Sequence, residues 1–138
     1  MTTDEGIMYD ICRTQEDIYK WAAARKYDMA AFSNAYLSSD FCRRAMDSEY
    51  SRFQLCDPDE CMDFIRPEIG TFETDLYFDE EVAGWIGWMY RFICFQTGIS
   101  SKKLNEKVSF NSMCAYYPGL HTVDERMAVE IISKDHKL

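Results

Sequence analysis

The chain has 138 residues, of which 47% are hydrophobic and 15% aromatic, and its 24 acidic and 15 basic side chains give a net charge of −9. This length suits a single domain over residues 1–138, and the hydrophobic content excludes a disordered chain, because disorder requires low hydrophobicity. No stretch reaches the roughly 18 apolar residues of a membrane span, and the acidic start, Met1-Thr2-Thr3-Asp4-Glu5, lacks the pattern of a secretion signal. We therefore expect a cytoplasmic protein with no membrane segment.

Apolar residues recur at the 3.6-residue period of a helix through the first half of the chain. They predict helices over residues 4–26, 29–37 and 58–65. A further helix is predicted to begin after Ser38 or Ser39 and to contain residues 41–46, and it either ends there or continues to Phe53. An alternative is that the first helix divides at Thr14, where a threonine followed by Asp17 is typical of an internal cap. The fourth helix begins at Asp57-Pro58, a strong start signal, and is expected to end before Pro67, because proline breaks a helix interior.

The least regular part of the sequence lies between residues 67 and 79. Six acidic and no basic side chains occur between Glu68 and Glu81. We expect an exposed acidic loop here, in which Glu73 and Asp75 contact a basic partner, because opposite charges speed encounter.

The second half contains the clearest helix of the chain, Glu80 to Thr97. Asp79 caps its start, and Gly98 supplies a left-handed exit. It is apolar on nearly every side, which predicts that it is buried at the centre or covered by a partner. Shorter helices are predicted over residues 101–107, 110–117 and 124–132, with a turn at Pro118-Gly119.

These elements predict an all-α bundle of seven or eight helices. Residues 18–65 and 89–132 share an order of features: an aromatic helix, a break, a short helix, an aromatic or methionine residue before a cysteine, and a final helix. A duplicated helical unit of roughly 45 residues would explain this order, and so would generic helix patterning.

No constellation for catalysis or metal binding emerges from the residue pattern. The six cysteines form no CxxC pair and lie among apolar neighbours, and only two histidines are present, so we expect neither a zinc site nor a cysteine nucleophile. There is no GxGxxG motif and no phosphate-binding loop. We therefore expect no enzyme activity and no cofactor.

The segment 97–108 resembles the turn and second helix of a helix-turn-helix unit. In a DNA-binding protein Lys102, Lys103 and Lys107 would face phosphates. However, the chain is acidic overall, and this helix has no arginine to read guanine. Nucleic acid is thus disfavoured as a partner, and DNA binding is the alternative function.

The most distinctive string of the chain runs from Tyr116 to Thr122. We expect it to form a binding loop, because it combines aromatic and hydrogen-bonding groups around a Pro-Gly turn. The structural interpretation is that Thr122 caps the last helix and His121 bonds back to the fold. With the acidic loop and the central helix, the predicted partner-binding residues are Tyr116, Tyr117, Gly119, Leu120, His121, Thr122, Glu73, Asp75 and Trp88, and Trp85 is a further aromatic anchor.

The string from Tyr117 to Thr122, followed by the apolar helix 128–132, resembles the ending of a small helical family from clostridial-type bacteria. The upstream part of that family is similar to residues 90–107, so the resemblance covers roughly 45 residues. Its members are encoded beside ADP-ribosyltransferase-like toxins, which implies an antitoxin or accessory role and a toxin as protein partner. The long N-terminal region departs from the family pattern, and the resemblance implies no catalytic residues.

Overall fold

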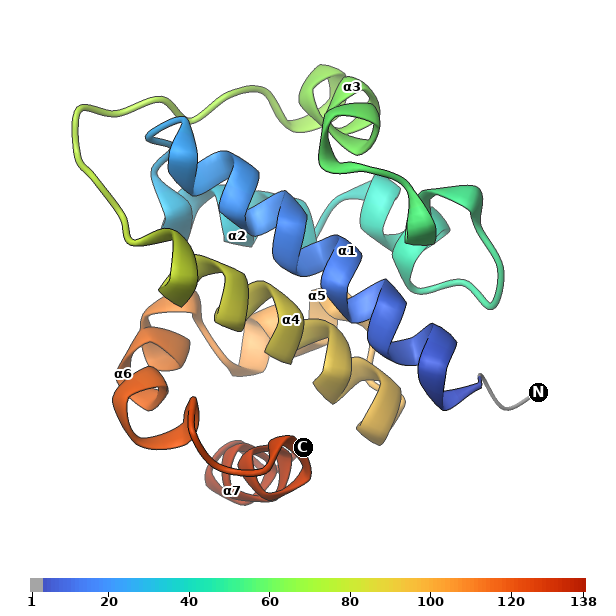
Figure 1. Ribbon diagram of the computed structural model, residues 1–138, viewed down its shortest axis with the longest axis vertical. Coiled ribbons are helices and arrows are strands. Elements are labelled where there is room, and N and C mark those ends of the chain that lie inside the picture. Colours follow the sequence, from blue (N-terminus) through green and yellow to red (C-terminus); the bar gives the residue numbers. More distant parts are fainter. Residues whose placement is uncertain (1–3) are drawn as a thin grey trace.

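The computed structural model describes residues 4–138, and helices dominate it (Figure 1). Residues 4–138 form seven α-helices, with a π-turn and a 3-10 turn between the second and the third. Their bounds are α1 Glu5–Ala24, α2 Met29–Leu37, the π-turn Cys42–Met46, the 3-10 turn Arg52–Leu55, α3 Pro58–Ile69, α4 Glu80–Thr97, α5 Ser101–Lys107, α6 Phe110–Leu120 and α7 Glu125–His136. Residues 4–138 contain no strand, only an isolated bridge between Tyr27 and Glu73. The predicted all-α fold is confirmed.

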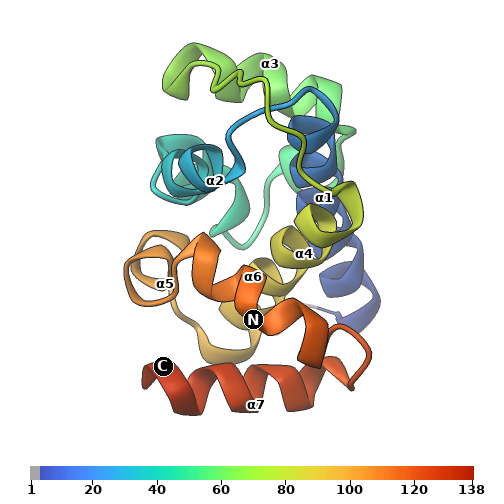
Figure 2. The ribbon, with the colours of Figure 1, turned by 90° about the vertical axis from the view of Figure 1, so that its left-hand side faces the viewer.

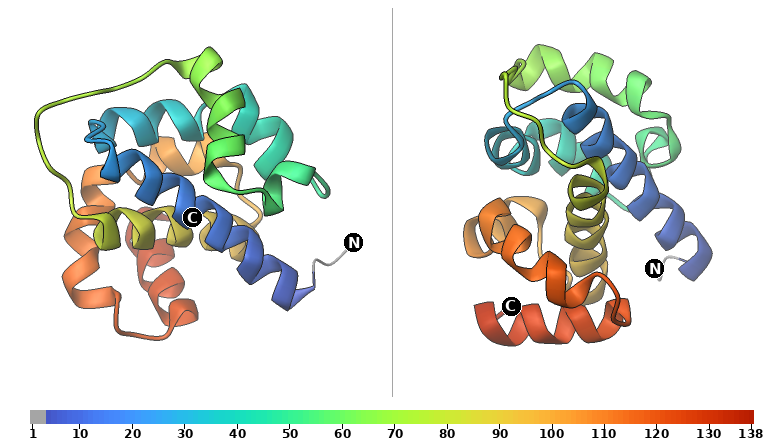
Figure 3. Two further views of the ribbon diagram at one scale, coloured as in Figure 1. Left: turned by 45° about the horizontal axis from the view of Figure 1, so that its top comes forward. Right: turned by 60° about the vertical axis from the view of Figure 1, so that its left-hand side comes forward.

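The two long helices α1 and α4 pack against each other at the centre of the molecule (Figures 1 and 3). Each begins at an aspartate, Asp4 or Asp79, whose carboxylate accepts hydrogen bonds from free N–H groups of the first turn. α4 ends at Gly98, whose φ of 76° is left-handed. The consecutive residues Met89–Ile93 are all buried, which at 3.6 residues per turn covers every side of the helix. The predicted central position of α4 is therefore confirmed.

The remaining helices surround this pair. α2, α3 and the two turns lie toward one end of the molecule, and α5 and α6 lie toward the other, where α7 crosses beneath them (Figure 2). The proposed units 18–65 and 89–132 run from α1 to α3 and from α4 to α7 respectively. Their common origin stays a prediction.

Two glycines of α4 allow close approach to α1. A Cβ atom at Gly87 would lie 2.7 Å from Cγ of Tyr19 and 2.9 Å from the carbonyl oxygen of Gln15. A Cβ atom at Gly84 would lie 2.5 Å from Cε of Lys20. The close approach also brings a hydrogen bond between the helices: Nε2 of the Gln15 side chain donates to the carbonyl oxygen of Gly87 at 2.8 Å. The Gly-x-x-Gly spacing thus sets the separation of the central helices.

In the first half of the chain, the alternative division of the first helix and the extension of a later helix to Phe53 are wrong. α1 is not divided at Thr14, whose hydroxyl donates to the carbonyl oxygen of Asp10 within an unbroken helix. The segment after Ser39 is helical, with Ser39 Oγ accepting from the N–H of Cys42 at 3.0 Å, but it forms a π-turn that ends at Met46, and a loop and the 3-10 turn replace the extension to Phe53. A contact distant in sequence holds the start of this segment: the Glu68 carboxylate accepts from the backbone N–H groups of Asp40 and Phe41, at 2.6 and 2.9 Å.

Two helices continue through prolines at which the sequence predicted an end. α3 passes Pro67 and ends at Ile69, and α6 passes Pro118 and ends at Leu120. Each proline is the third residue from its helix end, so it removes only one backbone hydrogen bond near a terminus that already has unpaired carbonyl groups. The predicted turn at Pro118-Gly119 is therefore wrong. α7 also extends four residues beyond the predicted end, to His136.

The acidic loop connects α3 to α4 and runs along the outside of the molecule (Figure 1). It spans residues 70–79, shorter than the predicted 67–79 because α3 is longer. Its first part is held by two backbone hydrogen bonds, from Asp28 N to Phe72 O at 2.6 Å and from Thr74 N to Lys26 O at 2.8 Å. Its outer part exposes Leu76 and Tyr77, at 74% and 73%.

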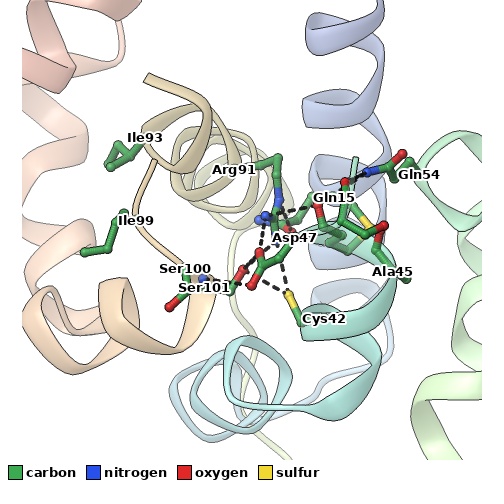
Figure 4. A network of polar contacts seen from close by, with 12 residues as sticks. Gln15, Cys42, Ala45, Asp47, Gln54, Arg91, Ile93, Ile99, Ser100 and Ser101 are labelled. Carbon is green, nitrogen blue, oxygen red and sulfur yellow. Dashed lines mark hydrogen bonds and ion pairs between the residues drawn. The ribbon is translucent and has the colours of Figure 1, made fainter. Parts of the chain in front are cut away.

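A buried arginine joins four elements (Figure 4). Arg91 of α4 is 1% exposed, and its Nη1 lies 2.7 Å from Oδ1 of Asp47, just after the π-turn. Its other N–H groups donate to Oε1 of Gln15 in α1, Sγ of Cys42 in the π-turn and Oγ of Ser101 in α5. Ser101 Oγ in turn donates to Asp47 at 2.6 Å. Ser101 is fully buried, and its contacts connect α5 to α4 and to the residue after the π-turn.

Candidate functional site

An open cavity of about 350 Å³ lies on the surface and is lined by residues of α1, α4 and the C-terminal end of α6. We call it the aromatic groove. It is lined by Glu16, Glu81, Trp85, Trp88, Tyr117 and His121.

Helical spacing places the aromatic side chains of the groove together. Trp85 and Trp88 are three residues apart on α4, and Tyr117 begins the last turn of α6, four residues before His121. Trp85 meets Tyr117 edge to face at 5.6 Å between ring centroids, and Tyr117 stacks on His121 at 4.2 Å. The other tryptophan, Trp88, stacks on Phe92 at 4.8 Å. The aromatic walls are therefore held in place by packing against one another.

A hydrogen bond fixes the imidazole of His121. Its Nδ1 lies 2.6 Å from the carbonyl oxygen of Tyr117. Because a carbonyl oxygen only accepts, Nδ1 carries the proton of this hydrogen bond. The sequence-based structural interpretation, that His121 bonds back to the fold, thus agrees with the geometry, and the ring still lines the groove.

The two carboxylates of the groove share one ammonium group. Lys20 Nζ lies 3.2 Å from Glu16 and 3.6 Å from Glu81. Burial opposes the charge of Lys20, but its hydrogen bond to Glu16 and the charges of both glutamates outweigh burial and raise its pKa. The side chain of Glu81 is 78% exposed, so most of this carboxylate faces solvent. The charged groups at this site therefore sum to a net negative charge.

The structure places three of the predicted partner-binding residues in the groove: Trp88, Tyr117 and His121. The anchor Trp85 joins them. Glu16 and Glu81 were not predicted. Glu81 is the last acid of the acidic run, a signal that pointed toward it, whereas only the packing of α1 against α4 brings Glu16 here.

The other predicted binding residues lie elsewhere. Tyr116 faces α7, where its hydroxyl donates to Asp135 at 2.6 Å. Leu120 is buried, Gly119 and Thr122 are exposed at the end of α6, and Glu73 and Asp75 are exposed in the acidic loop. Thr122 does not cap α7, because Asp124 accepts the N–H bonds of its first turn.

The cysteines whose pKa is strongly raised carry no reactive thiolate at neutral pH. Burial raises the pKa of Cys12 and Cys61 to about 12 and that of Cys94 to about 11. Within residues 4–138 no group of three or more Cys, His, Asp or Glu side chains is arranged to hold a metal ion.

The helix-turn-helix-like segment is part of the main bundle. α5 has seven residues and buries Ser101 and Leu104, while Lys102, Lys103 and Lys107 are exposed. These lysines lie away from the groove lining.

Comparisons with known proteins give no assignment: no family model, no curated protein and no solved structure matches the chain. In the part of the chain that the structure describes, none of the helices combines the length and apolar character needed to cross a bilayer.

Proposed function

We propose that this chain is a protein-binding module and that its partner docks on the aromatic groove. One observation carries this proposal: residues from α1, α4 and α6 bring three aromatic rings, an imidazole and two carboxylates into one open cavity. Tryptophan and tyrosine are the residues that most often dominate binding energy at interfaces, because they bury large rigid surfaces. The carboxylates favour a basic surface on the partner.

The resemblance of residues 117–132 to the clostridial-type family indicates which partner to test first. In that family the gene lies beside an ADP-ribosyltransferase-like toxin. We infer that this chain is an antitoxin or accessory regulator of such a toxin, and the net charge of −9 supports a basic partner surface.

Co-expression with the product of the adjacent gene tests the proposal. The two chains are expected to elute as one complex, and calorimetry gives its affinity. Replacing Trp85 by Ala together with His121 by Ala is expected to weaken binding by about 30-fold or more, the effect of a binding hot spot. Circular dichroism of the variant checks that it is folded.

The matched control is Lys102→Ala with Lys103→Ala on α5, which should bind the partner as the unchanged chain does. Separate monomeric elution of the two proteins, or equal affinity of the groove variant, would contradict the proposal. The same lysine variant addresses the DNA-binding alternative, which requires a salt-dependent shift of DNA that these substitutions weaken.

A further inference from the structure

The aromatic groove combines two features that attract a cation. Its charged lining consists of Glu16 and Glu81, and the nearby Lys20 offsets only one of the two charges. The faces of its tryptophan and tyrosine rings carry the negative part of the ring quadrupole, which attracts ammonium and guanidinium groups.

Elsewhere in the same chain, a guanidinium is already bound by an indole ring and a carboxylate. The guanidinium of Arg25 lies 3.7 Å from the ring centroid of Trp21. The carboxylate of Asp59 completes this arrangement, because it accepts the indole N–H of Trp21 at 2.7 Å and lies 3.8 Å from Arg25. An indole face, a carboxylate and a guanidinium therefore form one unit between α1 and α3.

The aromatic groove has the indoles and the carboxylates of such a unit, and its lining contains no arginine. We propose that the groove binds the guanidinium of an arginine side chain on the partner, stacked on the indole of Trp85 and paired with Glu81. Trp88 is already stacked on Tyr9 and Phe92, so Trp85 is the indole that we assign to this contact. This inference rests on the proposed function, because it names the group by which a protein partner is recognised.

Size and exposure fit a single long side chain. A cavity of about 350 Å³ is at the small end of ligand pockets, which fits one side chain better than a larger ligand. Glu81 is exposed and reachable, whereas Glu16 is half-buried and its carboxylate already contacts Lys20 at 3.2 Å. Arginine suits the site better than lysine, because a planar guanidinium stacks on an aromatic face while its N–H groups bond a carboxylate.

The test is a titration of the full chain with acetyl-Gly-Arg-Gly-amide, monitored by the NMR signals of the tryptophan indole N–H groups. The control peptide contains citrulline, which has the shape of arginine without its charge. We expect saturable shifts of the Trp85 and Trp88 signals at about millimolar concentration, and about tenfold weaker binding of the citrulline peptide. Equal responses to the two peptides, or no saturable shift with the arginine peptide, would overturn the inference.

Glu81→Gln removes the exposed charge and keeps the side-chain shape. It is expected to weaken arginine binding about threefold, while Glu80→Gln, which alters an exposed neighbour outside the lining, leaves it unchanged. Equal affinity of the Glu81 variant and the unchanged chain would contradict the pairing with Glu81.

The outcome for the proposed function remains distinguishable. A partner that binds the groove without any arginine-specific response contradicts the inference and leaves the proposed function standing. If the groove binds the arginine peptide but no protein partner is found, the proposed function is contradicted and the arginine site remains supported.

Discussion

At the scale of single residues, Arg91 is the position at which the fold is most vulnerable. Its charge is buried, and removing an ion from water costs several kcal/mol unless partners replace the lost hydration. Asp47 supplies the opposite charge at 2.7 Å, and Gln15, Cys42 and Ser101 supply polar contacts. These partners together replace the hydration that the buried guanidinium has lost.

Replacing Asp47 by Ala is expected to lower the free energy of unfolding by about 3 kcal/mol, because the Arg91 charge stays buried without its counterion. Urea unfolding monitored by circular dichroism measures the loss. Asp63→Ala is the matched control, since it removes a pair with Arg66 whose side chains are 70% and 44% exposed. The control should change stability by about 0.5 kcal/mol or less. A similar small loss for Asp47→Ala would show that the network does not hold the fold together.

This network also shows why individual contacts of the fold could not be predicted from the sequence. Arg91 lies 76 positions from Gln15 and 44 from Asp47. Neither Gln15 nor Asp47 belongs to a local motif, so only tertiary packing brings them to the arginine. The same reason applies to Glu16 in the aromatic groove.

At the scale of elements, the helix boundaries that depend on local signals were predictable. Asp57, Asp79 and Gly98 act on the adjacent turn, and each performs its expected capping role. The contact between the Glu68 carboxylate and the residues before the π-turn was not predictable, because Glu68 comes from another helix. The length of α3 was not predictable from Pro67, because the effect of a proline depends on how much helix follows it.

The packing of α1 on α4 depends on Gly87. Gly87→Ala is expected to destabilise the protein by about 1–3 kcal/mol, the typical cost of an extra methyl group in a tight contact. The backbone oxygen of Gln15, at 2.9 Å from the added carbon, moves only if the helix moves. Thermal or urea unfolding measures the effect.

Gly119→Ala is the matched control for this substitution. Gly119 lies in α6, and an added Cβ has no neighbour within 4 Å. Alanine there is expected to raise stability by about 0.4–1 kcal/mol, because it restricts the unfolded chain and favours the helix. If both variants change stability in the same direction, close approach at Gly87 does not limit the packing.

At the scale of the whole molecule, burial raises the pKa of several thiol and phenol groups. Burial is the first cause of a raised pKa for Cys12, Cys61 and Cys94, whose values rise to about 12, 12 and 11. It also raises the pKa of Tyr116 from 10.0 to about 12. The folded chain therefore keeps protons that the unfolded chain releases, so these groups contribute stability below pH 9 that is lost as the pH rises toward 12.

We expect the urea midpoint to stay constant between about pH 7 and 8 and to fall between about pH 9 and 11. The free energy of unfolding should fall by about 1.4 kcal/mol per pH unit for each thiol that ionises only in the unfolded chain. Titration of the ultraviolet thiolate absorbance should show the buried thiols ionising well above pH 9 in the native protein. The same protein in urea is the control and should ionise near the ordinary value of about 8.5. Cys12→Ala should make the decline shallower, because one of the shifted groups is removed. Coincident titrations of the native and unfolded chains would contradict the expectation, because raised thiol pKa values require a folded core that excludes water.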